Sequence, residues 1–330
     1  MHVHLENYTT KPKVFSLTPQ VARAAARSVK GMRVTCSDDF HSFDKNLRTA
    51  KVLVTSSDVV RDRRFPRGAA LRAAAPELQL VHLIGAGVEG VLPLDWLPSG
   101  VRLTNNSGVH ADKAREFQLM ALLALNARLP AMVTNQREAR WLQIFTPRIK
   151  GKRLAVLGLG DMGRAAVSAA KVLGLEVHGI RRSNGKVPHV GKLFKPHRLV
   201  NALKGCDFLV IAAPLTAETK GLVDEAALCA LKPGAGVVNV GRAGILDHDA
   251  LAKLLREGHL SGAILDVLPE EPLPETSVLW SVPNLVIVPH VSSDDAERYM
   301  RDTMALVCRN VQRLIAGRAI MNLVDPKTGY

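Results

Sequence analysis

The sequence predicts an α/β protein in which two domains each carry a parallel β-sheet. The chain has 330 residues, which exceeds the usual size of one hydrophobic core. Short apolar segments alternate with helical segments, as strands and helices of a parallel sheet do. Ala, Val and Leu dominate and aromatic residues make up only 4%, which is typical of sheets covered by helices on both faces.

The first hundred residues contain the elements expected of the first domain. Buried strands are predicted at 51–55 (KVLVT) and 78–84 (LQLVHLI), and a helix at 19–29. Near residue 105 the character of the chain changes, because Asn105-Asn106-Ser107-Gly108 has the composition of a turn. A domain boundary is therefore expected close to this turn.

A long helix at 111–129, which Pro130 is expected to end, leads into the second part of the chain. Six short apolar strands are predicted there, at 154–157, 175–180, 208–212, 237–240, 263–265 and 286–288. Helices are predicted between some of them, at 162–173, 224–231 and 247–257. A last helix at 294–317 follows the final strand, so it could return to the first domain.

The net charge of +14 is compatible with nucleic acid, a membrane surface or a small anionic ligand as partner. The basic residues are scattered, however. Clusters such as Arg61-Asp62-Arg63-Arg64 lack the neighbouring aromatic residues on which bases stack. We therefore expect a basic surface with neither a nucleic-acid nor a membrane partner.

Cysteine usage and hydropathy favour the cytoplasm. The four cysteines lie far apart without a CxxC pair, which predicts neither a zinc site nor a disulfide framework. No metal is expected elsewhere. Residues 1–13 lack the apolar core of a signal peptide, and no apolar run reaches the roughly 18 residues that span a membrane.

Gly158-Leu-Gly160-Asp161-Met162-Gly163 matches the dinucleotide-binding pattern G-x-G-x-x-G. The three glycines serve a tight turn, close approach of the backbone to a pyrophosphate, and tight helix–strand packing. The motif directly follows a predicted strand and opens a helix, whose free N–H groups would face the phosphates. This context favours a cofactor site over a plain structural turn.

The end of the second strand of this domain predicts which dinucleotide is preferred. An Asp or Glu usually stands there and accepts hydrogen bonds from the adenosine ribose. Here Arg181, Arg182 and Ser183 occupy the position. A carboxylate would repel a 2′-phosphate, whereas arginine can bind it through two parallel donors. NADP(H) is therefore expected over NAD(H); the competing interpretation is two solvated surface arginines.

Three further stretches carry a resemblance to a known family. They are 213–223 (APLTAETKGLV) with its continuation to Asp247, 265–274 (LDVLPEEPLP) and 288–293 (VPHVSS). With the glycine motif, in this order and spacing, they closely resemble the D-isomer-specific 2-hydroxyacid dehydrogenases over about residues 78–317. The glyoxylate/hydroxypyruvate reductase-like members are the most similar. The resemblance implies an oxidoreductase that uses NADPH to reduce a small 2-keto acid to the (R)-2-hydroxy acid.

The resemblance implies a catalytic triad. Arg242 stands at the family's substrate arginine, Glu271 at its catalytic carboxylate and His290 at its acid/base histidine. The chemistry asks for the same residue types. Negative charge develops on the ketone oxygen as hydride arrives, and histidine suits the donation of a proton. A carboxylate stabilises the protonated ring and fixes its tautomer, and a guanidinium can bind the substrate carboxylate bidentately.

Further roles follow from the likeness alone. Ala86 and Gly87 would offer backbone N–H groups to the substrate carboxylate. Asp266 would hold the nicotinamide carboxamide, and Pro214 and Val240 would line the cofactor cleft.

Trp141 matches a tryptophan that reaches the neighbouring subunit's active site in reductase-like members, although a tryptophan buried in a dimer interface explains it equally well. The sequence also departs from the family pattern. Arg242 is followed by Ala-Gly where Arg-Gly is common, and Glu89 stands where Asp is frequent. The segment after His290 is Ser292-Ser293-Asp294, where a Gly and a Thr are usual.

The resemblance predicts flavodoxin-like and Rossmann-type domains with an active-site cleft between them, and a homodimer. Residues 1–104 and 293–330 would form a discontinuous substrate domain and 105–292 the cofactor domain. A non-catalytic, NAD(P)-sensing, corepressor-like protein is the alternative, against which the complete triad weighs. Glyoxylate, hydroxypyruvate, phenylpyruvate and longer 2-keto acids all remain open as substrates.

Overall fold

The structure, a computed structural model, describes residues 1–6, 15–16, 18–37 and 45–325. The chain divides into two compact units, 1–110 with 295–330, and 111–294. The sequence placed the two boundaries slightly earlier, after residues 104 and 292. Each unit is described by itself below.

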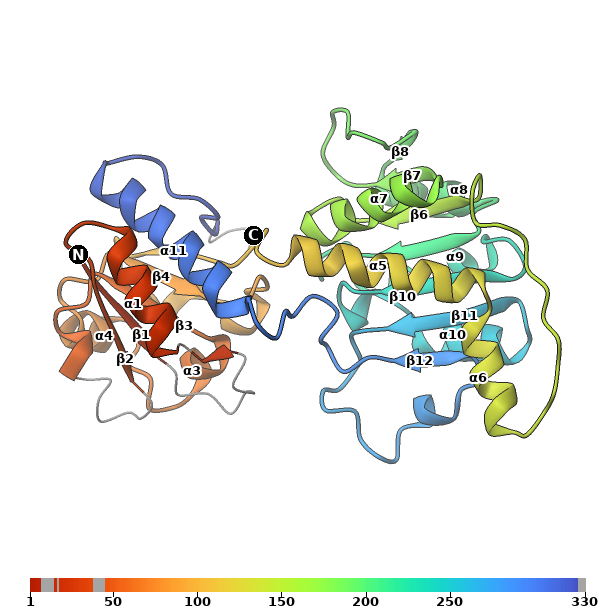
Figure 1. Ribbon diagram of the computed structural model, residues 1–330, viewed down its shortest axis with the longest axis horizontal. Helices are drawn as coiled ribbons and strands as arrows, with labels where there is room; N and C mark the ends of the chain where they lie inside the picture. Colours follow the sequence, from red (N-terminus) through yellow and green to blue (C-terminus); the bar gives the residue numbers. More distant parts are fainter. Residues whose placement is uncertain (7–14, 17, 38–44, 326–330) are drawn as a thin grey trace. The chain divides into compact units, whose positions relative to one another are not determined.

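The first unit contains a five-stranded, wholly parallel sheet with the strand order β2-β1-β3-β4-β5 (Figure 1). This is the flavodoxin-like order. The strands are β1 (His2–Glu6), β2 (Arg33–Ser37), β3 (Val52–Thr55), β4 (Leu80–Leu83) and β5 (Arg102–Thr104). The predicted strands β3 and β4 are confirmed, whereas β1, β2 and β5 were not predicted.

Helices cover both faces of this sheet, which explains why β3 and β4 are buried along their whole length. Val52 and Val54 of β3 pack with α1 (Pro19–Ser28) and α11 (Tyr299–Ile315). Leu53 points the other way and packs with α3 (Ser57–Arg61) and α4 (Ala69–Ala74). The C-terminal helix therefore completes the core that the N-terminal strands begin.

The second unit contains a seven-stranded, wholly parallel sheet with the strand order β12-β11-β10-β9-β6-β7-β8. Its strands are β6 (Arg153–Leu157), β7 (Glu176–Ile180), β8 (Lys192–Phe194), β9 (Phe208–Ile211), β10 (Ala235–Asn239), β11 (Leu260–Leu265) and β12 (Leu285–Ile287). The six predicted strands are present, and only β8 was missed. Because all strands are parallel, the loops that follow them emerge at one edge, where ligands of such sheets bind.

Two hydrophobic layers sandwich this sheet. The helices α5 (Ala111–Asn126) and α7 (Asp161–Leu173) pack on one face. The helices α8 (Leu199–Leu203), α9 (Glu225–Cys229) and α10 (His248–Arg256) pack on the other. Among the described residues no single helix is long and apolar enough to cross a membrane. Only α5 and the following α6 (Leu129–Arg137), bent by 65°, pass that test of length and composition as a pair.

The prediction that one helix runs from 111 to 129 and ends at Pro130 is wrong. α5 already ends at Asn126, and Arg128 adopts a left-handed conformation with φ of 60°. Pro130 instead lies in the first turn of α6. A proline is tolerated there because the first N–H groups of a helix have no intrahelical acceptor.

His82 makes the stability of the first unit depend on pH. Its ring lies wholly buried in β4, where Nδ1 is 2.9 Å from Thr104 Oγ1 and Nε2 is 3.3 Å from Asn106 Oδ1. Burial lowers the pKa of His82 to about 4, although the hydrogen bond that the ring donates to Asn106 Oδ1 opposes the shift. Below about pH 6.5 the imidazole of His82 therefore binds a proton in the unfolded chain but stays neutral in the folded chain.

We predict that His82→Gln removes part of the acid sensitivity of folding. The stabilisation from the neutral ring is complete above pH 6.5 and is lost as the pH falls toward 4. Between pH 7 and 4.5 the histidine contributes a loss of roughly 2–3 kcal/mol. Urea unfolding of wild type and variant at both pH values measures this difference. An equal loss of stability in the two proteins would contradict the assignment.

Candidate active site

The glycine-rich turn between β6 and α7 is packed against the backbone after β9. A Cβ on Gly158 would lie 2.6 Å from Ala213 Cα, and a Cβ on Gly163 would lie 1.9 Å from the carbonyl oxygen of Gly158. Apart from its chain neighbours, no atom of the described residues lies within 4 Å of the Cβ position of Gly160, which is exposed. Two glycines are thus required by the protein's own packing, while Gly160 leaves open space.

The first turn of α7 faces that open space without a side-chain cap. Gly160 is the N-cap residue, Asp161 and Met162 are partly exposed, and no side chain accepts a hydrogen bond from the first turn. Uncapped N–H groups and the positive end of the helix dipole make such a turn suitable for a phosphate. The residues present therefore fit a dinucleotide pyrophosphate.

Basic side chains line a cavity of about 370 Å³ beyond the end of β7. Arg181 borders it and donates from Nη2 to the carbonyl oxygens of Asn184, at 2.6 Å, and Gly185, at 2.8 Å. Lys186 and Lys195 also line it, and the described residues of its lining include no Asp or Glu.

The predicted neighbours of Arg181 lie in the same loop. Arg182 Nη1 is 3.5 Å from Glu218 Oε2. Ser183 is exposed and lines the cavity. Lys195 donates to the carbonyl oxygen of Arg182 and was missed by sequence reasoning, because it follows β8, a strand too short and too exposed for its pattern to show.

His290 and Glu271 form a hydrogen-bonded pair. His290 follows β12 and Glu271 lies in the loop after β11, and the two strands are neighbours in the sheet. His290 Nδ1 is 2.7 Å from Glu271 Oε2, and Glu271 Oε1 accepts a hydrogen bond of 3.0 Å from the backbone N–H of Leu268. The side chains are 53% and 37% exposed, so solutes can reach the pair.

A buried carboxylate fixes the backbone next to this pair. Asp266 is 3% exposed, and its Oδ1 accepts hydrogen bonds of 2.9 Å from the N–H groups of Val291 and Ser292. Its Oδ2 accepts a hydrogen bond of 2.5 Å from Ser292 Oγ. His290, directly before these residues, has a φ of 54°, which is uncommon for a residue other than glycine. The three hydrogen bonds hold the chain in the conformation that follows this strained residue.

Sequence reasoning did not find these three hydrogen bonds to Asp266. It assigned Asp266 to the nicotinamide carboxamide, which stays a prediction, since a carboxylate can accept about four hydrogen bonds. The available signal was Ser292, which lies in the segment after His290 where the sequence departs from the family pattern.

Arg242 lies at the same edge of the sheet, after β10. The strand β11 separates β10 from β12. The side chain of Arg242 is half-buried and donates from Nη1 to the carbonyl oxygen of Gly241, at 2.8 Å. The fully buried Asn239 stabilises this turn by accepting from the N–H of Gly241 and donating to the carbonyl oxygen of Arg242.

The remaining predicted residues fall in three places. Val240 is buried after β10, and Pro214 is exposed after the adjacent strand β9. Ala86 and Gly87 belong to the first unit, where Asn105 Nδ2 donates to the carbonyl oxygen of Ala86 at 2.8 Å. Trp141 lies between α6 and β6 with 95% of its surface exposed, outside the core of the second unit.

Residues 119–292 match the family profile described as "D-isomer specific 2-hydroxyacid dehydrogenase, NAD binding domain". This chain belongs to the D-isomer-specific 2-hydroxyacid dehydrogenase family. The resemblance predicted from the motifs is confirmed. The matched range includes the glycine turn, Arg242, Glu271 and His290, so the second unit of this dehydrogenase is its NAD(P)-binding domain.

Individual relatives agree with the family. Glyoxylate reductase from Aeropyrum pernix is 30% identical over 266 residues, which cover 77% of this dehydrogenase and 78% of the relative. A D-isomer specific 2-hydroxyacid dehydrogenase from Xanthobacter autotrophicus Py2, solved with NADPH and MES, matches with a TM-score of 0.83 and 28% identity over 100% of this chain and 99% of the other.

The NADPH-dependent glyoxylate/hydroxypyruvate reductase from Sinorhizobium meliloti, solved with NADP and sulfate, matches with a TM-score of 0.80 and 26% identity over 100% and 99% of the two chains. The predicted fold class of two α/β domains with parallel sheets is confirmed by these matches and by the strand orders.

We predict that Gly160→Ala and Gly163→Ala separate cofactor binding from folding. A methyl group at 160 meets no atom of the protein and fits the φ of −71° there, so stability should change little. It should weaken NADPH binding roughly 10- to 100-fold by obstructing the pyrophosphate. A methyl group at 163 collides with Gly158 and should destabilise folding by roughly 1–3 kcal/mol. Fluorescence titration with NADPH and thermal melts measure both effects; unchanged NADPH affinity in Gly160→Ala would contradict the pyrophosphate site.

Proposed function

We propose that this protein reduces a small 2-keto acid to the (R)-2-hydroxy acid with NADPH, and that His290 donates the proton. The observation that carries the proposal is the 2.7 Å contact between His290 and Glu271, located at the same sheet edge as the glycine-rich turn. The bound NADPH would supply a hydride to the carbonyl carbon, and His290 the proton that the carbonyl oxygen needs.

The proton path follows from the hydrogen bonds around the ring. Because Nδ1 faces the Glu271 carboxylate, Nε2 is the ring nitrogen that can donate toward a substrate. The carboxylate stabilises the imidazolium by a charge-assisted hydrogen bond, and its own orientation is held by the N–H of Leu268. After the reaction the neutral ring regains its proton from solvent, which its exposed position allows.

Arg242 would bind the substrate carboxylate and polarise the adjacent carbonyl group. Its half-buried guanidinium supports this role, since a bidentate ion pair gains strength away from bulk water. Ala86 and Gly87 would add backbone donors to the same carboxylate. The names of the relatives favour glyoxylate or hydroxypyruvate as the keto acid.

NADPH is proposed over NADH on the chemistry of the cavity beyond β7. The cationic side chains Arg181, Lys186 and Lys195 line it without a carboxylate, and Ser183 adds a hydroxyl group. A 2′-phosphate with two negative charges matches this lining, whereas a ribose hydroxyl does not use it. The two similar structures with NADPH or NADP bound support the same choice.

A homodimer formed through the cofactor-binding unit is proposed as the working assembly. The segment after α6 exposes Trp141 at 95%, Leu142 at 64% and Phe145 at 88%. Apolar side chains of this size favour burial against another protein surface. Trp141 would then reach the active site of the neighbouring subunit, and the cytoplasm stays the expected location.

We predict that His290→Gln lowers kcat for glyoxylate roughly 100- to 10,000-fold, the usual contribution of a general acid. NADPH binding should survive, because the phosphates are held at other loops. Glu271→Gln, which keeps a hydrogen bond but loses the charge, should lower kcat less and narrow the pH range of activity. Steady-state assays with NADPH and glyoxylate or hydroxypyruvate test this. Activity of His290→Gln within a few-fold of wild type would remove His290 from the mechanism.

We also predict that the wild type prefers NADPH and that the double variant Arg181→Ala, Lys195→Ala loses most of the preference. Each charge-assisted hydrogen bond to the 2′-phosphate should contribute about 1.5–3 kcal/mol, so one or two bonds give roughly a tenfold to several-thousand-fold ratio of kcat/KM. Lys253→Ala is the matched control, because Lys253 pairs with Glu225 on the surface, away from this loop. A preference for NADH in the wild type, or an unchanged ratio in the double variant, would refute the cavity as the 2′-phosphate site.

A further inference from the structure

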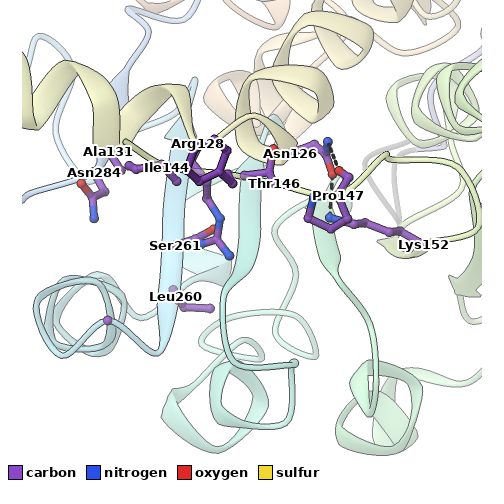
Figure 2. Close-up of a pocket in the computed structure, with 12 residues that line it drawn as sticks. Asn126, Arg128, Ala131, Ile144, Thr146, Pro147, Lys152, Leu260, Ser261 and Asn284 are labelled. Atoms are coloured by element: carbon purple, nitrogen blue, oxygen red, sulfur yellow. Dashed lines mark hydrogen bonds between the residues drawn. The ribbon is translucent and has the colours of Figure 1, made fainter. Parts of the chain in front are cut away.

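A second cavity, of about 310 Å³, opens at the opposite, amino-terminal edge of the seven-stranded sheet (Figure 2). Lys152 directly precedes β6, Leu260 begins β11 and Asn284 directly precedes β12. His290, by contrast, follows the carboxyl end of β12. The cavity is therefore separate from the candidate active site, although Phe145, which the proposed homodimer would bury, also lines it.

We propose that this cavity binds a small organic anion, with a carboxylate or phosphate group between Arg128 and Lys152 and an apolar part against Ile144 and Pro147. The volume lies at the lower end of the range of known small-molecule sites.

The charge of the lining supports an anion. Arg128 and Lys152 are its two cations, and no Asp or Glu lines it. Lys152 Nζ is hydrogen bonded to Asn126 Oδ1 at 2.7 Å, whereas the Arg128 guanidinium has no ion-pair or hydrogen-bond partner in the described part of the chain. With Asp207 as the only carboxylate that acts on Lys152 and none in the described lining, the two cations create a positive potential that an anion would neutralise.

The titration behaviour of the two cations agrees with this. Burial lowers the pKa of Arg128. Burial is also the largest cause that lowers the pKa of Lys152, and the charge of Arg128 acts in the same direction against the opposing effect of Asp207. Both groups therefore carry their charge at a cost that a bound anion would remove.

The backbone around Arg128 adds an independent observation. Arg128 is the N-cap residue of α6, with left-handed φ of 60° and ψ of 30°, and no side chain caps the helix. Ala131, in the first turn of this nine-residue helix, lines the cavity, so the positive end of the helix dipole faces the same space. A left-handed backbone is uncommon for a residue other than glycine.

The guanidinium of Arg128 reaches the turn before β10, where an added Cβ on Gly234 would lie 2.6 Å from Nη2. Figure 2 shows Arg128 extending along the strands toward Ser261, while Ile144 and Pro147 border the cavity from the segment between α6 and β6.

Phenyl phosphate and benzoate test the proposal, with phenol as the uncharged control. Titration calorimetry at constant ionic strength is run with saturating NADPH, which fills the cavity beyond β7. Apart from any anion bound at Arg242, we expect one probe anion to bind per chain in a manner that depends on Arg128, and phenol not to bind. Arg128→Gln and Lys152→Gln should each weaken binding roughly 10- to 100-fold, since each removes a charge-assisted hydrogen bond. Arg128→Lys should retain part of the affinity, and Arg181→Gln should retain all of it.

A measurement on the unaltered protein guards against variants that fail to fold. Acylation of lysine side chains with a water-soluble reagent, read by mass spectrometry, should slow at Lys152 when phenyl phosphate is added. Lys253, on the exposed surface of α10, should react at an unchanged rate. These readouts measure binding, so they do not depend on the proposed reductase activity.

Three outcomes would overturn the proposal. One is that neither probe binds and Lys152 is not protected. Another is that binding is lost only in Arg181→Gln. The third is that Arg128→Gln weakens self-association in sedimentation experiments without any probe, because a carboxylate of a second copy would then be the natural occupant of the cavity.

Discussion

The common direction of the seven strands in the second unit is the constraint on which its candidate site depends. Gly158, Arg181, Arg242, Asp266 and His290 lie far apart in the sequence. Each follows closely after a different strand of the same parallel sheet, so all five emerge at one edge. Glycines at 158 and 241 then let the loops after β6 and β10 approach the backbone at Ala213 more closely than any side chain would allow. The geometry of the candidate site is thus set by the common strand direction and by the glycines at 158 and 241.

Most of this edge could be predicted from sequence, because buried parallel strands are uninterrupted apolar runs and backbone contacts leave glycines at fixed spacing. The strands that escaped prediction lack such a run, either because they are short and exposed, as β8 is, or because their polar residues are buried, as in β1. In β1 the alternating His2 and His4 are buried, and both rings contact the hydroxyl of Thr35 on β2. Hydrophobicity cannot reveal such a strand, since these two rings are hydrogen bonded to a residue about thirty positions away.

The net charge illustrates the same limit. The basic residues that give the net charge of +14 are scattered along the sequence, which predicted a basic surface without a specific site. Folding collects part of that charge at two cavities of the second unit, one beyond β7 and one at the amino edge of the sheet. Spacing could not predict the second, because Arg128 and Lys152 are brought together by the left-handed turn between α5 and α6, which the sequence suggested was continuous helix.

The three hydrogen bonds that Asp266 accepts explain how the exposed His290 can be held in position for the proposed reaction. A residue other than glycine with positive φ costs roughly 1–3 kcal/mol, and the half-exposed His290 has few packing contacts to offset this. Three hydrogen bonds to one buried carboxylate can offset it, since hydrogen bonds to charged groups each contribute about 1.5–3 kcal/mol. One of them comes from the hydroxyl of Ser292, which a glycine could not supply. The departure from the family pattern after His290 therefore strengthens the positioning of the proposed acid, because it ties the strained turn to the core through β11.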